Sequence, residues 1–200
     1  MPAAVIAAAI LATTSCLFLS RTSEPVPAAK RPSNWALPIE TEWLPNFYKV
    51  TDDLYRGAQP TAKGIEQLKD IGIKTIINLR SAHSDKDEIG QIDIGYESIN
   101  FKPWHVEQED IKRFLAIVTD KTKTPVFVHC KYGADRTGFM CAVYRIAVCG
   151  WEKQAAIDEM VNGGFGFHPM WKNIIKSLEK IDTAQIRKSI PDPIRPGKPD

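Results

Sequence analysis

One short stretch, Val126–Phe139, constrains the fold of this 200-residue chain more than any other. It reads V-F-V-H-C-K-Y-G-A-D-R-T-G-F: a β-branched and aromatic run, a loop with one glycine, and the start of an apolar helical pattern. This order predicts a strand over Val126–His129 that leads into a helix over Arg136–Cys149. A strand followed directly by a helix is the repeating unit of parallel sheets, so the stretch indicates an α/β fold.

The remaining periodicity supports this interpretation. Helical patterns cover four further segments: Thr61–Ile71, Glu107–Thr119, Glu152–Asn162 and one that begins near Pro169. The other strand candidates are short and rich in Ile, Val, Tyr and Phe: Tyr48–Val50, Leu54–Arg56, Lys74–Leu79 and Tyr96–Phe101. We therefore expect a central, mostly parallel sheet of about four or five strands, flanked by helices, with Val126–His129 in a central position.

The two ends of the chain differ from its middle. Residues 1–20 have no charged side chain, and an apolar segment of this length is typical of a signal peptide or a membrane anchor. Residues 21–45 are rich in proline and predict a linker. The expected domain covers 46–183, and the proline-rich end, 184–200, is expected to be disordered.

The apolar segment also bears on localisation. We expect export from the cytoplasm, to the periplasm, or retention in the membrane through residues 1–20. Arg21, Lys30 and Arg31 follow the segment, and positive charge there favours the cytoplasmic side of a membrane, which is the alternative.

Composition excludes several functional classes. The formal net charge is +2 and no block of like charge is present, so no nucleic-acid partner is expected. The chain has four cysteines, whose spacing fits neither a disulfide framework nor a zinc site. We expect a monomer that needs no metal and no other cofactor.

The loop after Val126–His129 has the residues that attack on a phosphate ester requires. Cys130 lies before the N-terminus of the next helix and near Arg136, and both favour an ionised thiol. A curled loop from Lys131 to Arg136 can point its backbone N–H groups inward at an anion, and Gly133 tolerates the positive φ that such a curl requires. The guanidinium of Arg136 can hold two phosphate oxygens at once.

The loop therefore gives a set of site residues. We predict Cys130, Arg136, Asp135 and Thr137 as catalytic, the last through a hydroxyl close to the sulfur, and His129, Lys131, Tyr132, Gly133 and Ala134 as substrate-binding. The ring of His129 can also hold the loop by hydrogen bonds. Asp135 has an alternative interpretation, a structural partner, because its charge would oppose phosphate binding. Singly, each residue has an ordinary structural explanation, and only their combination is specific.

That combination, H-C, five residues, then R-T-G, resembles the signature of the cysteine-dependent protein phosphatases, in their dual-specificity branch. L-Y-R-G-A-Q-P, G-I-K-T-I-I-N-L-R, Y-R-I-A-V-C-G-W and G-G-F-G-F-H are similar to segments of bacterial atypical members, some of which are exported. The resemblance covers about Phe47 to Leu178. It implies the protein-tyrosine-phosphatase-like fold and a phosphocysteine intermediate on Cys130, stabilised by Arg136 and then hydrolysed by water.

The chain departs from the family's pattern at the general acid. The family normally has an aspartate on a loop before the cysteine, and the corresponding window, Tyr96–His105, has none. His105, Glu107 and Asp110 are the candidates to replace it, although acidic residues at a helix start also stabilise the helix dipole and stay solvated. A weak or misplaced acid favours phosphotyrosine over phosphoserine, because phenolate is the better leaving group.

We therefore expect a protein phosphatase that acts on phosphotyrosine in a protein or peptide, with phosphoserine and phosphothreonine as further substrates. Two alternatives stay open. One is a phosphoanhydride or phosphoinositide phosphatase of the same fold, because Lys131 is shared with related lipid phosphatases. The other is a phosphate-binding pseudophosphatase that has lost turnover together with its acid.

Overall fold

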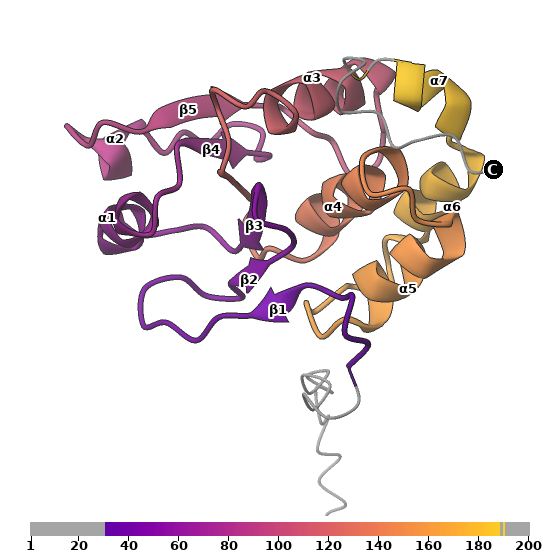
Figure 1. Cartoon of the computed structure of the whole chain (residues 1–200), viewed down its shortest axis with the longest axis horizontal. Coiled ribbons are helices and arrows are strands. Elements are labelled where there is room, and N and C mark those ends of the chain that lie inside the picture. Colours follow the sequence, from indigo (N-terminus) through magenta and orange to yellow (C-terminus); the bar gives the residue numbers. More distant parts are fainter. Residues whose placement is uncertain (1–30, 189, 191–200) are drawn as a thin grey trace, which may run out of the picture.

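The computed structural model describes residues 31–188 and 190, which form a sheet covered by helices on both faces (Figure 1). The strands are β1 (Leu37–Pro38), β2 (Tyr48–Lys49), β3 (Leu54–Gly57), β4 (Thr75–Asn78), β5 (Gly95–Ser98) and β6 (Val126–His129). Their order in the sheet is β1-β2-β3-β6-β4-β5. β1, β2 and β3 pair antiparallel, whereas β3, β6, β4 and β5 are parallel neighbours. The mostly parallel sheet is confirmed, with one more strand than expected.

Helices follow the strands in the expected alternation. They are α1 (Ala62–Asp70), α2 (Lys86–Ile89), α3 (Gln108–Val118), α4 (Asp135–Ala147), α5 (Lys153–Asn162), α6 (Lys172–Lys180) and α7 (Thr183–Lys188). In Figure 1, α1 and α2 lie on one side of the sheet and α3 to α7 on the other. The four-residue α2 was not predicted, because it is too short to show a helical period.

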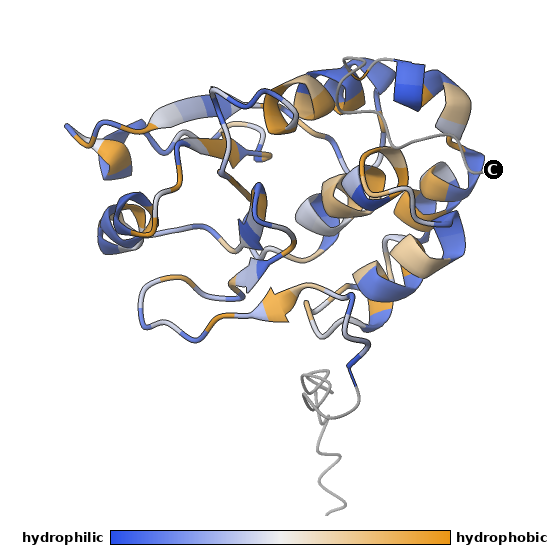
Figure 2. Cartoon of the chain, in the orientation of Figure 1, coloured by the Kyte–Doolittle hydropathy of each residue, from blue (hydrophilic) through white to orange (hydrophobic). Residues whose placement is uncertain are grey.

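Each side of the sheet has its own core. β6 is buried over its whole length, since strands pair with it on both edges and helices cover both faces. Phe127 belongs to the core under α1, whereas Val126 and Val128 belong to the larger core under α3 to α6. α1 shows the corresponding amphipathic pattern, with its apolar residues along one side in Figure 2. This double coverage fixes the position of the strand that leads into the loop.

The segment expected to be a linker is partly folded. Within 21–45, the described residues contain β1, and Ala36 and Leu44 are buried. The Ala36 N–H donates a 2.5 Å hydrogen bond to Glu159, which also pairs with Arg145 at 2.8 Å. The boundary expected at residue 46 was therefore wrong: proline is tolerated in a two-residue edge strand, which composition alone cannot distinguish from a linker.

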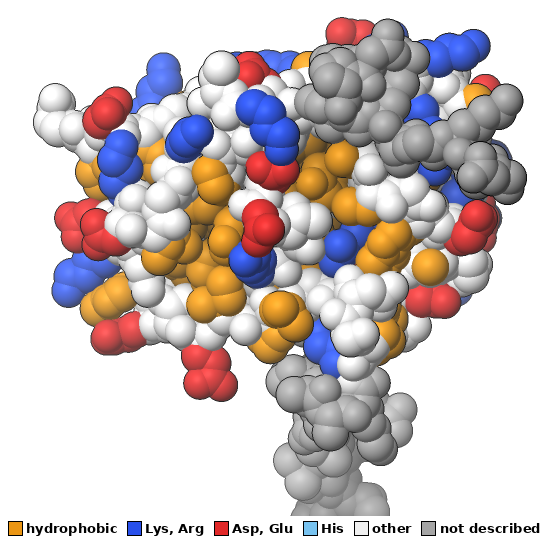
Figure 3. Space-filling view, in the orientation of Figure 1, with side chains coloured by type: hydrophobic (Ala, Val, Ile, Leu, Met, Phe, Trp, Pro, Cys, Tyr) orange, Lys and Arg blue, Asp and Glu red, His pale blue; other side chains and the backbone are white. Residues whose placement is uncertain are grey.

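The end of the chain differs from expectation in the same way. All but the first residue of α7 and the buried Ile190 lie within 184–200, which was expected to be disordered. The expected signal peptide or anchor, residues 1–20, lies outside the described residues, as do 189 and 191–200. Among the helices that the structure describes, none has the length and apolar character to cross a bilayer. On the face shown in Figure 3, cationic and anionic side chains are interspersed with apolar ones.

Candidate active site

The loop from Cys130 to Ala134 lies at the carboxyl edge of the sheet. β6 ends at His129 between its parallel neighbours β3 and β4, and α4 begins at Asp135. Ligands of parallel sheets bind beyond the carboxyl ends of the strands, where helix N-termini present free N–H groups. Cys130 is buried at this point, with 3% of its surface exposed. The sheet therefore places the thiol directly in front of the first turn of α4.

The curl of the loop depends on glycine. Gly133 has φ +69°, a backbone conformation that glycine adopts at little cost. A Cβ at this position would lie 2.4 Å from the carbonyl carbon and oxygen of Gly57, at the end of the neighbouring strand β3. Gly133 thus meets two requirements at once, a left-handed backbone and close contact with β3.

A buried arginine supports the loop from behind. Arg56 of β3 is 1% exposed, and its Nη2 donates to the carbonyl oxygens of Gly133, at 2.6 Å, and Ala134, at 3.4 Å. Its guanidinium carbon lies 3.6 Å from the ring centroid of Phe165. These hydrogen bonds fix two loop carbonyls on the side of β3. Sequence reasoning missed Arg56, although the motif L-Y-R-G-A-Q-P that contains it was noted.

A second buried network holds the start of the loop. The Nε2 of His129 donates a 2.7 Å hydrogen bond to Asp85, and its Nδ1 lies 3.3 Å from the carbonyl oxygen of Cys130. Both side chains are fully buried. The expectation that His129 binds substrate was therefore wrong: the strand register points its ring into the core, where it positions Cys130.

Asp85 has several further partners. Its Oδ1 accepts hydrogen bonds from Gln59, at 2.5 Å, and Asn78, at 3.2 Å, and His83 Nε2 lies 3.3 Å away. Burial opposes ionisation of Asp85, but the hydrogen bonds from His129 and Gln59 outweigh it and hold the pKa of this carboxyl below its usual range. Sequence reasoning missed Asp85 because it lies in a polar surface-like run, S-A-H-S-D-K-D-E.

The first turn of α4 contributes two of the expected catalytic residues. Arg136 is half-buried, and its Nη1 donates a 3.3 Å hydrogen bond to the carbonyl oxygen of Leu79. Thr137 is fully buried, and its hydroxyl has no hydrogen-bond partner in the described part of the chain. Because an unpaired buried hydroxyl is costly, this group is available to a thiolate or to a bound anion.

A cavity of about 250 Å³ opens beside the loop. Its lining consists of Pro103, Lys131, Tyr132, Asp135, Arg136, His168, Met170 and Trp171. Lys131 and Tyr132, both expected to bind substrate, are exposed here, and Tyr132 and Met170 form an apolar rim. The expected contribution of Gly133 and Ala134 is limited to their backbone, because both are buried.

Asp135 binds the segment that precedes α6. Its Oδ1 accepts a 2.8 Å hydrogen bond from the backbone N–H of His168, and its Oδ2 lies 2.9 Å from His168 Nδ1. Only 8% of Asp135 is exposed. This pairing corresponds to the structural partner that the sequence suggested as an alternative, and it brings into the cavity a histidine that was not among the predicted site residues.

The three candidate acids lie elsewhere. His105 and Glu107 are exposed, Asp110 is half-buried, and none of them lines the cavity. Burial and the charge of Glu107 raise the pKa of Asp110, as a general acid requires, but Asp110 does not line the cavity beside the loop. From this segment only Pro103 reaches the cavity, where its carbonyl oxygen accepts a 2.5 Å hydrogen bond from Asn173.

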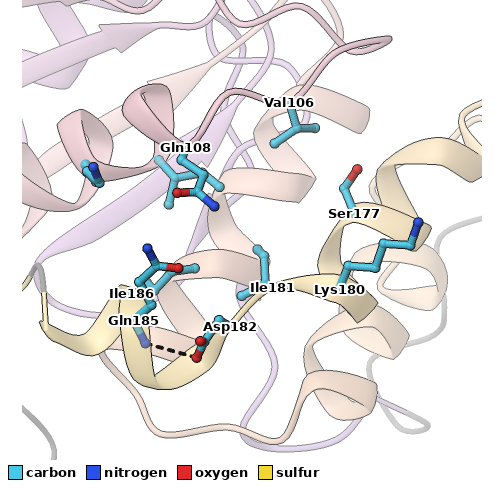
Figure 4. A pocket seen from close by; sticks show the side chains of 10 residues that line it. Val106, Gln108, Ser177, Lys180, Ile181, Asp182, Gln185 and Ile186 are labelled. Atoms are coloured by element: carbon cyan, nitrogen blue, oxygen red, sulfur yellow. Dashed lines mark hydrogen bonds between the residues drawn. The ribbon is translucent and has the colours of Figure 1, made fainter.

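A second cavity, of about 270 Å³, lies between α3, α6 and α7 (Figure 4). Val106, Ile111, Ile181 and Ile186 give it an apolar lining, and no cysteine or histidine takes part. On its α7 side the backbone N–H of Gln185 donates a hydrogen bond to the side chain of Asp182, so this carboxylate caps the start of α7. This cavity has no nucleophile comparable to Cys130.

The other described cysteines are not competing nucleophiles. Burial raises the pKa of Cys141 to about 11, and it also raises the pKa of Cys149. Among the residues that the structure describes, no group of three His, Cys, Asp or Glu side chains is arranged to hold a metal ion. Thiol chemistry at this site therefore falls to Cys130.

A cysteine at the base of a curled anion-binding loop, between a central parallel strand and a helix, defines the class of cysteine-based phosphatases. The family described as "DSP-PTPase phosphatase fused to NAD+ kinase" matches residues 42–170. This chain belongs to that family of dual-specificity phosphatases.

Known relatives agree with this assignment. The chain is 35% identical to the dual specificity protein phosphatase TpbA of Pseudomonas aeruginosa (strain UCBPP-PA14) over 143 residues, which is 70% of this chain but 63% of TpbA. It is 24% identical to inositol diphosphatase DSP3 of Arabidopsis thaliana, over 72% of this chain and 75% of that protein.

The solved structures include P. aeruginosa TpbA as a cysteine-to-serine variant in complex with phosphotyrosine. This chain matches it with a TM-score of 0.72 and 29% identity, over 80% of this chain and 98% of the other. A crystal structure of P. aeruginosa TpbA gives a TM-score of 0.71 and 30% identity, over 79% of this chain and 97% of the other. The protein-tyrosine-phosphatase-like fold expected from the sequence is confirmed.

Proposed function

We propose that this chain is a protein phosphatase that hydrolyses phosphotyrosine, with phosphoserine and phosphothreonine as further substrates, through a phosphocysteine intermediate on Cys130. One observation carries the proposal. Cys130 begins a loop that Arg56 supports at Gly133 and Ala134 and that His129 supports at Cys130 itself. A loop that is already held in its curled form binds a phosphate without the cost of ordering.

The reaction follows from this geometry. The thiolate of Cys130 attacks phosphorus, and the bond between phosphorus and the leaving oxygen breaks. Arg136 and the loop N–H groups bind the three remaining oxygens of the phosphoryl group. The unpaired hydroxyl of Thr137 donates to the sulfur when it leaves. Water then attacks phosphorus, the phosphorus–sulfur bond breaks, and inorganic phosphate and the thiolate are released.

The surroundings of the cavity favour an aryl ester. Tyr132 is 56% exposed and Met170 is 76% exposed, an uncommon position for large apolar side chains, and both line the cavity together with Trp171. An aromatic ring that approaches the loop would pack against this rim. The TpbA complex with phosphotyrosine supports the same substrate class.

A second candidate is phosphoanhydride cleavage. Lys131 lines the cavity beside Arg136, so two cations face the ligand, which suits a densely phosphorylated substrate. The relative DSP3 is named an inositol diphosphatase. An inositol pyrophosphate is therefore the natural competitor of a phosphotyrosine peptide.

The test uses the full chain and its Cys130→Ser variant, purified under reducing conditions. Phosphate release is measured from a phosphotyrosine peptide and from an inositol pyrophosphate. We expect turnover of the peptide, and we expect Cys130→Ser to lower it by at least about 10,000-fold. Peptide binding without release would reject the proposal in favour of a phosphate-binding module. Release from the inositol pyrophosphate alone would favour the second candidate.

We also propose that the chain acts outside the cytoplasm as a monomer, with residues 1–20 as a signal peptide or anchor. The absence of charge in that segment supports this location. Cell fractionation of the full chain tests it: recovery in the cytoplasmic fraction at full length would overturn it.

A further inference from the structure

The cavity beside Cys130 lacks the three acids that the sequence offered, so the proton for the leaving oxygen must come from another group. We propose that His168, oriented by Asp135, donates this proton and then accepts one from the attacking water. The inference rests on the proposed phosphatase function and assigns it a further catalytic residue. It depends on the position of the His168 ring, on the contacts that hold this ring in place and on its Nε2 atom.

The position is set by a two-point contact. Asp135 accepts the backbone N–H of His168 at 2.8 Å and contacts the ring Nδ1 at 2.9 Å. Asp135 and Arg136 are consecutive residues of the first turn of α4, and Asp135, Arg136 and His168 all line the same cavity. The imidazole is thus held at the cavity that the expected phosphate clamp also lines.

Further contacts fix the segment that carries His168. Asn46 Nδ2 donates to the carbonyl oxygens of Tyr132, at 2.8 Å, and Phe165, at 2.9 Å, so one amide bridges the loop and this segment. The ring of Phe165 also packs on Arg56, which supports the loop. Beyond the histidine, the carbonyl oxygen of His168 accepts the N–H of Trp171 at 3.0 Å. The ring is therefore tied to the loop before any substrate binds, as efficient proton transfer requires.

The roles of the two side chains follow from their hydrogen bonds. Both oxygens of Asp135 accept from His168, so the carboxylate serves as an acceptor and not as a proton donor. With Nδ1 directed at Asp135, the ring presents Nε2, which has no hydrogen-bond partner in the described part of the chain. The other titratable or charged groups of the cavity are Lys131, Tyr132 and Arg136, and none of them hydrogen-bonds to the imidazole.

Each step balances. In the first, the thiolate of Cys130 forms a bond to phosphorus, the bond to the leaving oxygen breaks, and that oxygen takes the proton from Nε2 of the imidazolium. In the second, water attacks phosphorus, Nε2 takes a proton from the water, and the sulfur leaves as thiolate. The imidazolium and the thiolate are both restored, and no other reactant is needed.

The test is His168→Gln in the full chain, with His105→Gln as the matched control at an exposed histidine outside the cavity. Two aryl esters separate proton donation from a structural role. Phenyl phosphate has a leaving group that needs a proton, whereas 2,4-dinitrophenyl phosphate has one that leaves readily as an anion. General-acid catalysis contributes roughly 100-fold to 10,000-fold, so we expect His168→Gln to lose about 100-fold or more on phenyl phosphate.

On the dinitrophenyl ester the same variant should retain activity within about threefold, because that step does not need the acid. The alkaline fall of kcat/KM for phenyl phosphate should disappear in His168→Gln and stay in His105→Gln. Asp135→Asn should show the same dependence on leaving group, and the double variant should lose no more than His168→Gln alone.

Three results would overturn the inference while leaving the proposed function in place. The first is an equal loss on both esters in His168→Gln, which would indicate a structural role. The second is unchanged activity of His168→Gln on phenyl phosphate. The third is a selective loss on phenyl phosphate in His105→Gln instead of His168→Gln. If the unmodified chain turns over neither ester, the proposed function fails first, and this outcome is recognised without any variant.

Discussion

The phosphate loop, Cys130–Arg136, and the segment Lys102–Asp110 were both expected to supply catalytic groups, and the structure treats them differently. The loop is supported from behind by the buried side chain of Arg56, and its start by the buried pair of His129 and Asp85. In the second segment His105 and Glu107 are exposed, and Trp104 is 66% exposed. One region is held in one conformation by its surroundings, whereas the other contributes only Pro103 to the cavity.

A motif is informative where its residues also constrain the local backbone. Within the loop, the residues that bind phosphate also determine the curled backbone conformation, so one sequence motif indicates both. In the second segment, residue type alone suggested a role, and no local constraint aims those side chains at the loop. Changes that loosen the loop should therefore reduce activity strongly, and changes in Lys102–Asp110 should not.

The largest effect is expected for Gly133→Ala. The positive φ of Gly133 and the 2.4 Å approach of an added Cβ to Gly57 both oppose the substitution. A strained non-glycine residue of this kind costs about 1–3 kcal/mol before any clash is counted, so the loop should open. We expect a loss of about 100-fold or more in kcat/KM on a phosphotyrosine peptide. Gly72→Ala is the control, because Gly72 also has a positive φ but no atom within 4 Å of an added Cβ. Equal losses of activity in both would show that strain alone, and not the contact with β3, decides.

Arg56→Met should follow. The substitution keeps apolar volume but leaves the carbonyl oxygen of Gly133 without its Arg56 donor, whereas that of Ala134 keeps the N–H of Gly138 at 2.7 Å. Hydrogen bonds to charged groups contribute about 1.5–3 kcal/mol each, so we expect the free energy of unfolding to fall by about 2–4 kcal/mol. Urea denaturation measures this change, and kcat/KM should fall by about tenfold or more because the loop is no longer held. A stable but inactive variant would show that Arg56 acts on the substrate and not through the loop.

Most of the fold could be predicted from the sequence. Val126–Val128 is apolar and leads through His129 into a loop, as expected of a strand buried on both faces, and the longer helices show their period. The exceptions were β1 and α2, which are too short to have a period, and α7, which lies mostly in the end expected to be disordered. Proline suggested a linker at β1, although a short edge strand tolerates it.

The site could be predicted only in its local part. Cys130, Arg136 and Gly133 are recognisable because their functions depend on neighbours along the chain. Arg56 and Asp85 depend on contacts with residues more than forty positions away, which no local pattern shows. His129 was assigned to substrate because residue type cannot tell which way a side chain points at the end of a strand.

The support that Asp85 gives to the start of the loop depends on pH. Because the pKa of Asp85 is lowered in the folded chain, its stabilising contribution is complete above the ordinary aspartate pKa of about 4 and is lost as pH falls through the lowered value. Asp85→Asn removes the charge and one of the two acceptor oxygens, so His129 on one side and Gln59 with Asn78 on the other can no longer both be satisfied, and we expect a loss of about 2 kcal/mol at pH 7. Thermal unfolding at pH 7 and at pH 3 measures the difference, which should shrink at pH 3. A difference independent of pH would show that the charge of Asp85 does not support the loop.

The smallest effect is expected in the second region. Glu107→Gln and Asp110→Asn keep the size of the side chains and remove their charge at the start of α3. Loss of an acidic residue at a helix N-terminus costs about 0.3–1 kcal/mol, so the melting temperature should fall slightly in Glu107→Gln. Because the pKa of Asp110 is raised, its charge is disfavoured in the folded chain, and Asp110→Asn should not lower the melting temperature. Since neither side chain lines the cavity, kcat/KM on a phosphotyrosine peptide should stay within about twofold of the unmodified chain. A selective loss on phenyl phosphate in Asp110→Asn, with the dinitrophenyl ester unaffected, would mean that this segment moves to the loop during turnover. In that case the selective loss would identify Asp110 as the proton donor in place of His168, and its raised pKa would suit that role.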